Sequence, residues 1–231
     1  MKYRTQIILA LDVDNHQKAM RWVKLLYPKI KIFKVGLQLY TACGPAIIRE
    51  IRKTGAEVFL DLKFNDIPNT MVGAVKEALK YKAAMLTVHT LSGPTALKEV
   101  ANACRGSKTR ALGVTILTSI CQRFLKDLTI KRSLSDEVLY LAKMAKRCGL
   151  DGVVSSPEET KIIRKNLGKK FLIVTPGIRP AAAGGDDQKR IAMPLAAVKA
   201  GSDFLVIGRP ILEAKDPLSA TQAILDSIKF N

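Results

Sequence analysis

The sequence predicts an α/β fold, a (β/α)8 TIM barrel that occupies residues 1–231 as a single domain. Three observations favour this fold. Short apolar or β-branched runs alternate with segments of helical periodicity, which is typical of βαβ units around a parallel sheet. The length of 231 residues suits one barrel of about 200–250 residues. Polar and charged residues also gather where the predicted strands end, which is where a barrel carries its active site.

The eight predicted strands are short runs rich in Ile, Val, Leu and Phe. They are Ile7–Asp12, Ile32–Gly36, Glu57–Lys63, Met85–His89, Ala111–Thr118, Gly152–Ser155, Phe171–Thr175 and Phe204–Gly208. The helical patterns between them include His16–Leu26, Gly44–Thr54, Thr70–Tyr81, Asp136–Cys148 and Ala192–Ala200. A Rossmann-like sheet is the alternative fold, and it is less favoured because no G-x-G-x-x-G follows the first strand.

The net charge of +18 raises the question of a nucleic-acid partner, because basic proteins attract phosphate. The lysines and arginines are scattered, however, and only 6% of the residues are aromatic. A stacking platform for single strands is therefore not expected. The sequence favours a basic, solvated surface and no nucleic-acid partner.

The cysteines and histidines do not form a metal-binding pattern. The four cysteines lie far apart without a C-x-x-C pair, and the two histidines are His16 and His89, so no metal site is predicted. Asp12 interrupts the apolar run near the N-terminus, and no stretch approaches the ~18–20 apolar residues of a membrane span. We expect a cytoplasmic protein with reduced cysteines and no membrane partner.

Charged residues end the predicted third strand. Because side chains alternate between the faces of a strand, one set is expected to face the outer helices, namely Val58, Leu60, Leu62 and Phe64. The other set is expected to face the barrel interior, namely Phe59, Asp61, Lys63 and Asn65. Burying an ion is costly unless it is paired, so Asp61 and Lys63 form either a structural ion pair or a site.

Lys34 favours the site. It ends the second strand and faces inward if its neighbours Phe33 and Val35 pack outward. An alternating array of lysines and aspartates is more than a structural pair requires, and it would hold Lys63 charged and ready to donate a proton.

A second cluster follows the seventh and eighth strands. The segment Val174–Arg190 is a long loop rich in glycine and alanine, and such loops are often active-site lids. Gly208 and Arg209 follow the last strand, where barrels frequently bind phosphate. The sequence therefore predicts a phosphorylated small molecule as the substrate.

A series of short motifs spans nearly the whole chain in a fixed order. They are Leu9-Ala-Leu-Asp12, Lys34-Val-Gly36, Asp61-Leu-Lys-Phe-Asn-Asp-Ile-Pro-Asn-Thr70, His89-Thr-Leu-Ser-Gly93, Val114-Thr-Ile-Leu-Thr-Ser119, Thr175-Pro-Gly-Ile-Arg179, Asp186-Asp-Gln188 and Ile207-Gly-Arg209. Each motif is weak alone, but the ordered set resembles the orotidine 5′-phosphate decarboxylases, which make UMP, and the bacterial form is the closer match.

The resemblance implies a cofactor-free decarboxylase of orotidine 5′-phosphate with no metal. It implies that Lys63 protonates C6 of the pyrimidine and that Asp61 lies beside the departing carboxylate, with Lys34 and Asp66 completing the catalytic set. Asp12 and Lys34 would hold the ribose, and Asp66 and Thr70 would reach the neighbouring site of a homodimer. The remaining implied substrate-binding residues are Leu62, Phe64, Asn65, Ile67, Pro68, Asn69, Thr118, Pro176, Arg179, Gln188, Gly208 and Arg209.

His89 is expected to support Asp61 and Lys34 through hydrogen bonds, and a satisfied core histidine is the alternative. Two other functions stay open. Related barrels act on keto-sugar phosphates through magnesium, but they need a carboxylate where this chain has Lys34. A basic phosphate-binding or nucleic-acid-binding module would fit the charge and leave Asp61, Lys63 and Asp66 unexplained.

Overall fold

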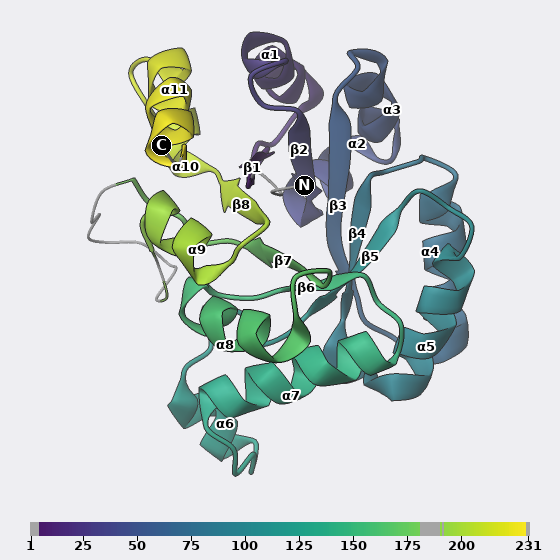
Figure 1. Cartoon of the computed structure of the whole chain (residues 1–231). Coiled ribbons are helices and arrows are strands. Elements are labelled where there is room, and N and C mark those ends of the chain that lie inside the picture. The colour runs from purple at the N-terminus through teal and green to yellow at the C-terminus, as the bar shows by residue number, and fades with distance from the viewer. Residues whose placement is uncertain (1–4, 181–189, 191, 230–231) are drawn as a thin grey trace.

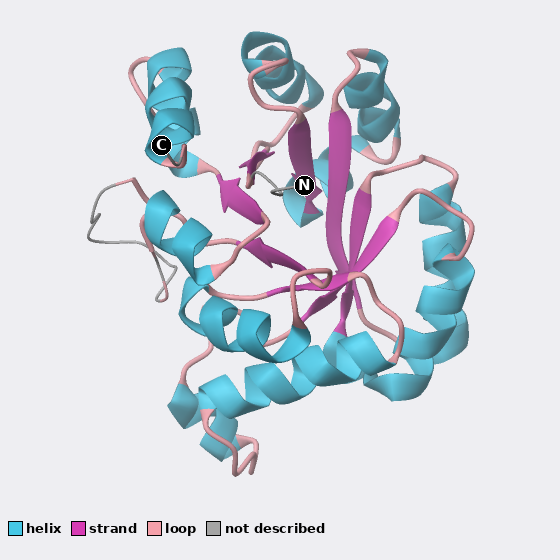
Figure 2. Ribbon diagram, in the orientation of Figure 1, coloured by secondary structure: helices cyan, strands magenta, loops and turns pink. Residues whose placement is uncertain are grey.

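The structure is a computed structural model that describes residues 5–180, 190 and 192–229. Eight parallel strands form a closed barrel in sequence order, surrounded by helices (Figures 1 and 2). The strands are β1 (Gln6–Ala10), β2 (Ile32–Gly36), β3 (Glu57–Phe64), β4 (Met85–His89), β5 (Arg110–Val114), β6 (Gly152–Val154), β7 (Leu172–Thr175) and β8 (Phe204–Ile207). The pairing of β8 with β1 closes the barrel, and the predicted TIM barrel is confirmed.

The helices follow the strands around the barrel. They are α1 (His16–Leu26), α2 (Leu37–Cys43), α3 (Ala46–Lys53), α4 (Pro68–Leu79), α5 (Gly93–Cys104), α6 (Gln122–Asp127), α7 (Leu134–Arg147), α8 (Pro157–Leu167), α9 (Pro194–Ala200), α10 (Arg209–Leu212) and α11 (Pro217–Ser227), with a short 3₁₀ helix η1 (Thr90–Ser92). Local chemistry fixes several starts. Asn15 caps α1 by accepting the Lys18 N–H at 2.9 Å, and Ser133 caps α7 in the same way.

Two predicted elements differ most from the observed ones. The helix predicted over Gly44–Thr54 is preceded by a separate helix, α2, because Gly44 has a φ of 61° and Pro45 follows it. The fifth strand ends at Val114 instead of Thr118. Beyond Val114 the carbonyls of Ile116 and Leu117 accept hydrogen bonds from the Arg190 guanidinium, so this segment leaves the strand ladder.

The core has two layers. Outward-facing residues such as Phe33, Val58 and Leu60 pack against the helices. A smaller cluster fills the barrel interior and consists of Ile8, Ala10, Ile32, Phe59, Met85, Leu112, Val174, Phe204 and Val206. The inward position of Lys34 is therefore confirmed, since its neighbours Phe33 and Val35 belong to the outer layer.

A bulge lies at the carboxyl end of β3. Leu60 pairs with Leu86, whereas Phe64 pairs with Val88, so β3 carries extra residues relative to β4. Lys63 lies in this stretch with a φ of 51°, which non-glycine residues seldom adopt. The prediction that Asn65 faces the interior was wrong: Asn65 is exposed, and its Oδ1 accepts a hydrogen bond from Ser92 Oγ at 2.7 Å.

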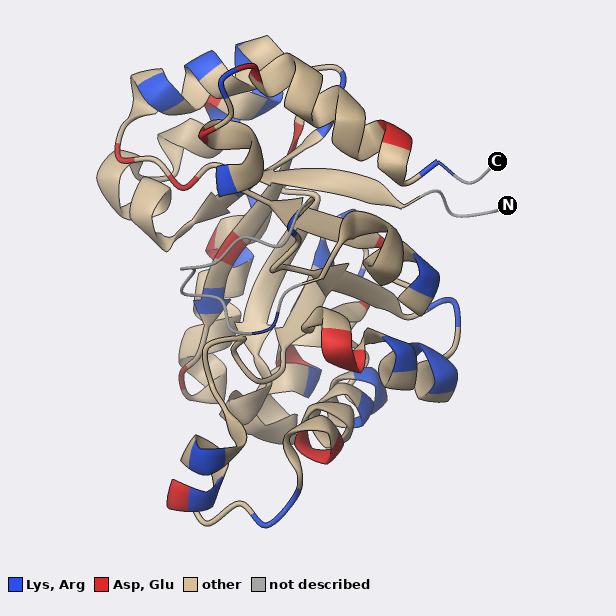
Figure 3. Ribbon diagram, turned by 90° about the vertical axis from the view of Figure 1, so that its left-hand side faces the viewer, with Lys and Arg blue, Asp and Glu red and all other residues tan. Residues whose placement is uncertain are grey.

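Charge is spread widely over the ribbon, with lysines and arginines on many helices and loops (Figure 3). Within the described residues, no helix is long and apolar enough to cross a membrane.

Candidate active site

A cavity of about 640 Å³ opens at the carboxyl ends of the strands. Its lining comes from most of the strands and from the loops that follow them. The predicted residues among the lining are Asp12, Lys34, Asp61, Lys63, Thr118, Pro176, Arg179, Gly208 and Arg209. The cavity lies above the apolar cluster of the barrel interior, because Ala10, Phe59 and Val206 belong to both.

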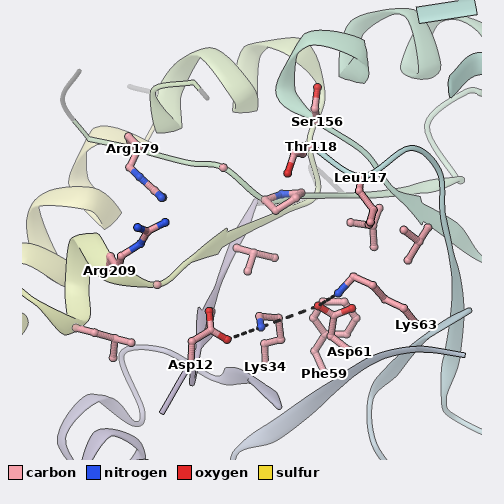
Figure 4. A pocket seen from close by; sticks show the side chains of 18 of the residues that line it. Asp12, Lys34, Phe59, Asp61, Lys63, Leu117, Thr118, Ser156, Arg179 and Arg209 are labelled. Carbon is pink, nitrogen blue, oxygen red and sulfur yellow. Dashed lines mark hydrogen bonds and ion pairs between the residues drawn. The ribbon is translucent and has the colours of Figure 1, made fainter. Parts of the chain in front are cut away.

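Four charged side chains form a continuous chain along one wall of the cavity (Figure 4). Lys34 Nζ lies 2.8 Å from Asp12 Oδ1 and 4.0 Å from Asp61 Oδ2. Lys63 Nζ lies 2.9 Å from the same Asp61 oxygen. Positive and negative groups therefore alternate from β1 to β3, and each cation has a carboxylate neighbour.

The inner members of this chain are shielded from water. The side chains of Lys34 and Asp61 are 12% and 11% exposed, whereas that of Asp12 is 58% exposed. Charge–charge interactions are stronger when water is partly excluded. The charge interactions of the array are thus strongest around Asp61, and Asp12 is its solvent-exposed end.

Thr87 on β4 fixes the geometry of the β3 bulge, and sequence reasoning did not find it. Its side chain is fully buried, and Oγ1 accepts the Lys63 backbone N–H at 2.9 Å. The same hydroxyl donates to Asp61 Oδ1 at 3.0 Å. One hydroxyl therefore orients the Asp61 carboxylate and satisfies the backbone of Lys63. A threonine in an apolar strand gives no signal of such a role, because the sequence does not reveal the bulge beside it.

Two glycines lie close to the charged groups. A methyl group at Gly36 would lie 2.8 Å from Lys34 Nζ, so the ammonium occupies space that only glycine leaves free. At Gly208 the nearest atom to an added methyl would be the Ala10 Cβ at 3.4 Å, which places the backbone after β8 close against β1.

Arg179 and Arg209 lie at the other end of the cavity from Lys63 (Figure 4). Arg179 follows β7 and is 8% exposed, and Arg209 begins α10 directly after β8. Guanidinium groups bind phosphate oxygens in a forked geometry. The cavity therefore has a cationic end suited to a phosphate and, opposite it, an alternating charge array.

Other predicted residues lie outside this cavity. Leu62 and Phe64 pack against the outer core, as the strand alternation required. The segment after the bulge, residues 65–70, is mostly exposed and does not line the cavity; Asp66 Oδ1 accepts the Ile67 N–H at 2.6 Å. Gln188 lies outside the described residues.

His89 has a different partner from the one expected. Its Nδ1 accepts the Leu91 backbone N–H at 3.3 Å, and the described residues include no hydrogen bond from His89 to Asp61 or Lys34. Burial, and to a smaller extent the positive charge of Lys63, lower the pKa of His89. Thr87, two residues before His89 on the same strand, faces the bulge of β3. Thr87 therefore forms the hydrogen bond to Asp61 that was expected of His89.

Further lining residues were not among the predicted substrate-binding residues, although Ser155 ends a predicted strand. Trp22, Ser155 and Ser156 contribute to the cavity wall. Ser155 Oγ is buried without a hydrogen-bond partner among the described residues. Among the residues that the structure describes, no group of three or more His, Cys, Asp and Glu side chains could hold a metal ion.

Comparisons with known proteins place the chain in a family. The family model described as "Orotidine 5'-phosphate decarboxylase / HUMPS family" matches residues 5–224. The chain belongs to this family. An orotidine 5′-phosphate decarboxylase of Geotalea daltonii is 48% identical to it, covering 97% of this chain and 96% of the relative. A second relative with the same name, from Geobacter metallireducens, is 46% identical over 97% of this chain and 96% of its own.

A solved structure supports the same family assignment. The crystal structure of orotidine 5′-phosphate decarboxylase from Lactobacillus acidophilus matches with a TM-score of 0.84 and 35% identity. The match covers 98% of this chain and 100% of the other. The resemblance inferred from the ordered motifs is therefore confirmed at the level of the family.

Proposed function

We propose that this chain decarboxylates orotidine 5′-phosphate to UMP and CO2 in de novo pyrimidine biosynthesis, without a cofactor. The family and the names of its relatives support this reaction. The single observation that carries it is the array Asp12–Lys34–Asp61–Lys63, which faces a cavity with two arginines at its far end. Such a cavity fits a nucleotide whose phosphate and reacting carboxylate lie at opposite ends.

Lys63 is proposed as the proton donor. Loss of CO2 breaks the bond between C6 and the carboxyl carbon and leaves the electron pair on C6. An ammonium preorganised beside that carbon stabilises the developing charge and then transfers its proton to C6. The contact of Lys63 Nζ with Asp61 at 2.9 Å supports a fixed position for this ammonium.

Asp61 and Lys34 are proposed to complete the charge array around the reacting group. Asp61 would lie beside the substrate carboxylate and repel it, a ground-state effect that we treat as secondary. Lys34 and Asp12 would hold the ribose hydroxyls. The 2.8 Å contact between them would orient both groups before the substrate arrives.

The remaining proposed contacts are with the uracil ring at one end of the nucleotide and the phosphate at the other. Thr118 is proposed to contact the uracil ring, and Arg179, Gln188, Gly208 and Arg209 to bind the phosphate, with Pro176 at the start of the loop that carries Arg179. Binding energy gained at the phosphate can be used at the distant C6, because only interactions completed in the transition state raise the rate.

A homodimer is proposed as the working form, with Asp66 and Thr70 reaching into the neighbouring site. Both residues are exposed and lie outside the cavity of their own chain. Ile67 and Leu91 nearby are 67% and 56% exposed, which is typical of an apolar contact surface. We also propose a cytoplasmic location, where the four cysteines would stay reduced.

The test is a spectrophotometric assay of orotidine 5′-phosphate turnover with the wild type and Lys63→Ala. Loss of the proton donor should lower kcat by at least about 10²-fold, while much of the ligand binding remains. Lys98→Ala, which removes an exposed lysine on α5, is the matched control and should turn over normally. Normal turnover by Lys63→Ala would refute the role of Lys63.

Two further measurements separate the alternatives. Activity should persist in EDTA; loss on chelation and recovery with magnesium would move the assignment to the keto-sugar phosphate group. Mixing inactive Lys63→Ala chains with inactive Asp66→Ala chains should restore some activity, because one mixed site regains intact residues from both subunits. Failure to recover activity despite proven subunit exchange would contradict the shared site.

A further inference from the structure

A second, larger cavity lies at the amino end of the barrel, opposite the active site. Its volume is about 1070 Å³. Its floor is apolar and consists of Ile32, Met85 and Phe204, all buried members of the interior cluster. Because that cluster fills the barrel, the amino-end cavity and the active site are separate.

The rim of the amino-end cavity is strongly basic. Lys31, Arg52, Lys82, Lys108 and Arg110 line it and are exposed, whereas Glu57 is the one carboxylate among the described lining residues. None of these five cations forms an ion pair with a described residue, although other cations of the chain do. Like charges held around one concavity raise the local potential and attract anions.

Neighbouring carboxylates are already engaged. Asp203 Oδ2 lies 2.6 Å from Arg164 Nη2 and accepts the Ile173 N–H at 2.8 Å. Asp151 Oδ2 accepts the Ala111 N–H at 2.8 Å. The basic surface instead continues past Arg110 to Lys169 and Lys170, which line an adjoining hollow. The chain therefore supplies little negative charge to this rim.

Helix electrostatics account for only part of this cluster. Cations in the last turn of a helix complement its dipole, and the effect falls off within that turn. Arg52 lies in the last turn of α3. Lys82, by contrast, lies beyond the end of α4, and Lys108 and Arg110 lie beyond the end of α5. These three cations lie at or just before the first residues of β4 and β5. The dipole of the preceding helix does not stabilise a cation there.

We propose that the amino-end cavity binds a linear chain of phosphates, of the inorganic polyphosphate type. Such a chain carries charge on every unit and on all sides, so it can contact cations around a concave rim. An extended acidic peptide points alternate side chains to opposite faces and uses only half of its charge. Among the described lining residues, the only aromatic is Phe204, at 6% exposure, so bases have no ring on which to stack.

The experiment measures fluorescence anisotropy of a labelled short inorganic polyphosphate on the intact protein at low salt and over a salt series. The test variant is the triple Lys82→Ala, Lys108→Ala, Arg110→Ala, and all three positions are exposed. The matched control removes the same charge from exposed sites on α5, α7 and α8 as Lys98→Ala, Lys143→Ala and Lys161→Ala. Circular dichroism checks that each variant is folded.

We expect the test variant to bind at least about tenfold more weakly and to lose roughly three units of salt slope, about one per phosphate contact removed. At about 0.15 M salt in the series, where the Debye length is about 8 Å, the control should change by less than about threefold, since charges away from the rim are largely screened. The double variant Arg179→Ala, Arg209→Ala should bind polyphosphate normally, which separates this cavity from the active site.

Three outcomes would overturn the proposal. The first is no binding of polyphosphate at low salt. The second is an equal loss in the test and control variants, which would indicate diffuse attraction by the net charge. The third is tighter binding of a single-stranded oligonucleotide or an acidic peptide of equal charge, which would make this surface one for nucleic acid or protein. The inference does not rest on the decarboxylase activity, and none of these outcomes depends on turnover.

Discussion

Thr87→Val tests whether one buried hydroxyl holds the reactive pair in place. Valine has nearly the same shape, so the substitution removes the two hydrogen bonds of Thr87 Oγ1, at 2.9 Å to the Lys63 N–H and 3.0 Å to Asp61 Oδ1, and leaves the packing. A hydrogen bond to a charged group contributes about 1.5–3 kcal/mol, and a buried unsatisfied N–H costs about 1–3 kcal/mol. We expect the free energy of unfolding to fall by about 2.5–6 kcal/mol, the sum of these two contributions.

The effect on turnover follows from geometry. Asp61 would lose the donor that fixes its carboxylate, and the Lys63 backbone at φ 51° would lose its partner. A displacement of about 1 Å in a reacting group costs on the order of 10²-fold in rate. We expect kcat to fall by about 10–10²-fold while KM changes little, because the substitution does not touch the proposed phosphate and ribose contacts.

Two variants control for a general loss of stability. Thr87→Ser keeps the hydroxyl and should restore most of kcat. Thr109→Val removes a hydroxyl that donates to the Ala83 carbonyl at 2.7 Å at the far end of the barrel, and it should lower stability without lowering kcat. Denaturant unfolding and the decarboxylation assay give both quantities. A Thr87→Val protein with kcat within about twofold of the wild type would refute the positioning role.

Three further predictions concern other groups. Gly36→Ala places a methyl group 2.8 Å from Lys34 Nζ, so kcat/KM should fall at least about tenfold in the decarboxylation assay, with the fold retained. Burial and the charge of Lys63 lower the pKa of His89 below 6.5, so the unfolded chain binds more protons just below that pH. Stability should therefore fall on acidification, and His89→Gln should reduce this loss in urea unfolding between about pH 7.5 and 5.5. Burial raises the pKa of Cys104 to about 11, so alkylation of the folded protein at neutral pH, followed by mass spectrometry, should spare it.

Each of these predictions has an outcome that contradicts it. Wild-type kinetics for Gly36→Ala would mean that the ammonium can shift without cost. For the histidine, His16→Gln is the control because His16 is exposed; equal pH dependence in both variants would exclude a special contribution of His89. For the thiol, labelling of Cys104 as fast as the exposed Cys121 would show that the buried site opens readily.

The fold was predictable from the sequence because strand and helix periods differ along the whole chain. The predicted strands Ile32–Gly36 and Met85–His89 match β2 and β4 residue for residue. The errors arise where tertiary contacts decide. The carbonyls of Ile116 and Leu117 bond to Arg190, which is distant in sequence, and no local pattern reveals that the predicted strand must stop before them.

The site was predictable to the extent that it depends on strand ends. Asp12, Lys34, Asp61 and Lys63 follow from alternation and polarity, and the structure brings them into one chain of contacts. Thr87 was missed because its role depends on the bulge in β3, which is a property of the pairing with β4. Asn65 was misplaced because β3 ends at Phe64, so the alternation of strand faces no longer applies to the next residue.

The pairing of β8 with β1, the seam that closes the barrel, makes ligand binding depend on complete folding of the barrel. The charge array comes from the first three strands, whereas the two arginines follow the last two. The charge array and the two arginines face one cavity only after Leu9 pairs with Ile207 and Gly208 packs close to Ala10. A partly folded chain with this seam open would keep the array and lose the anion end. A phosphorylated ligand that spans both ends would therefore bind the closed barrel alone, and it should slow unfolding by making the seam the last contact to break.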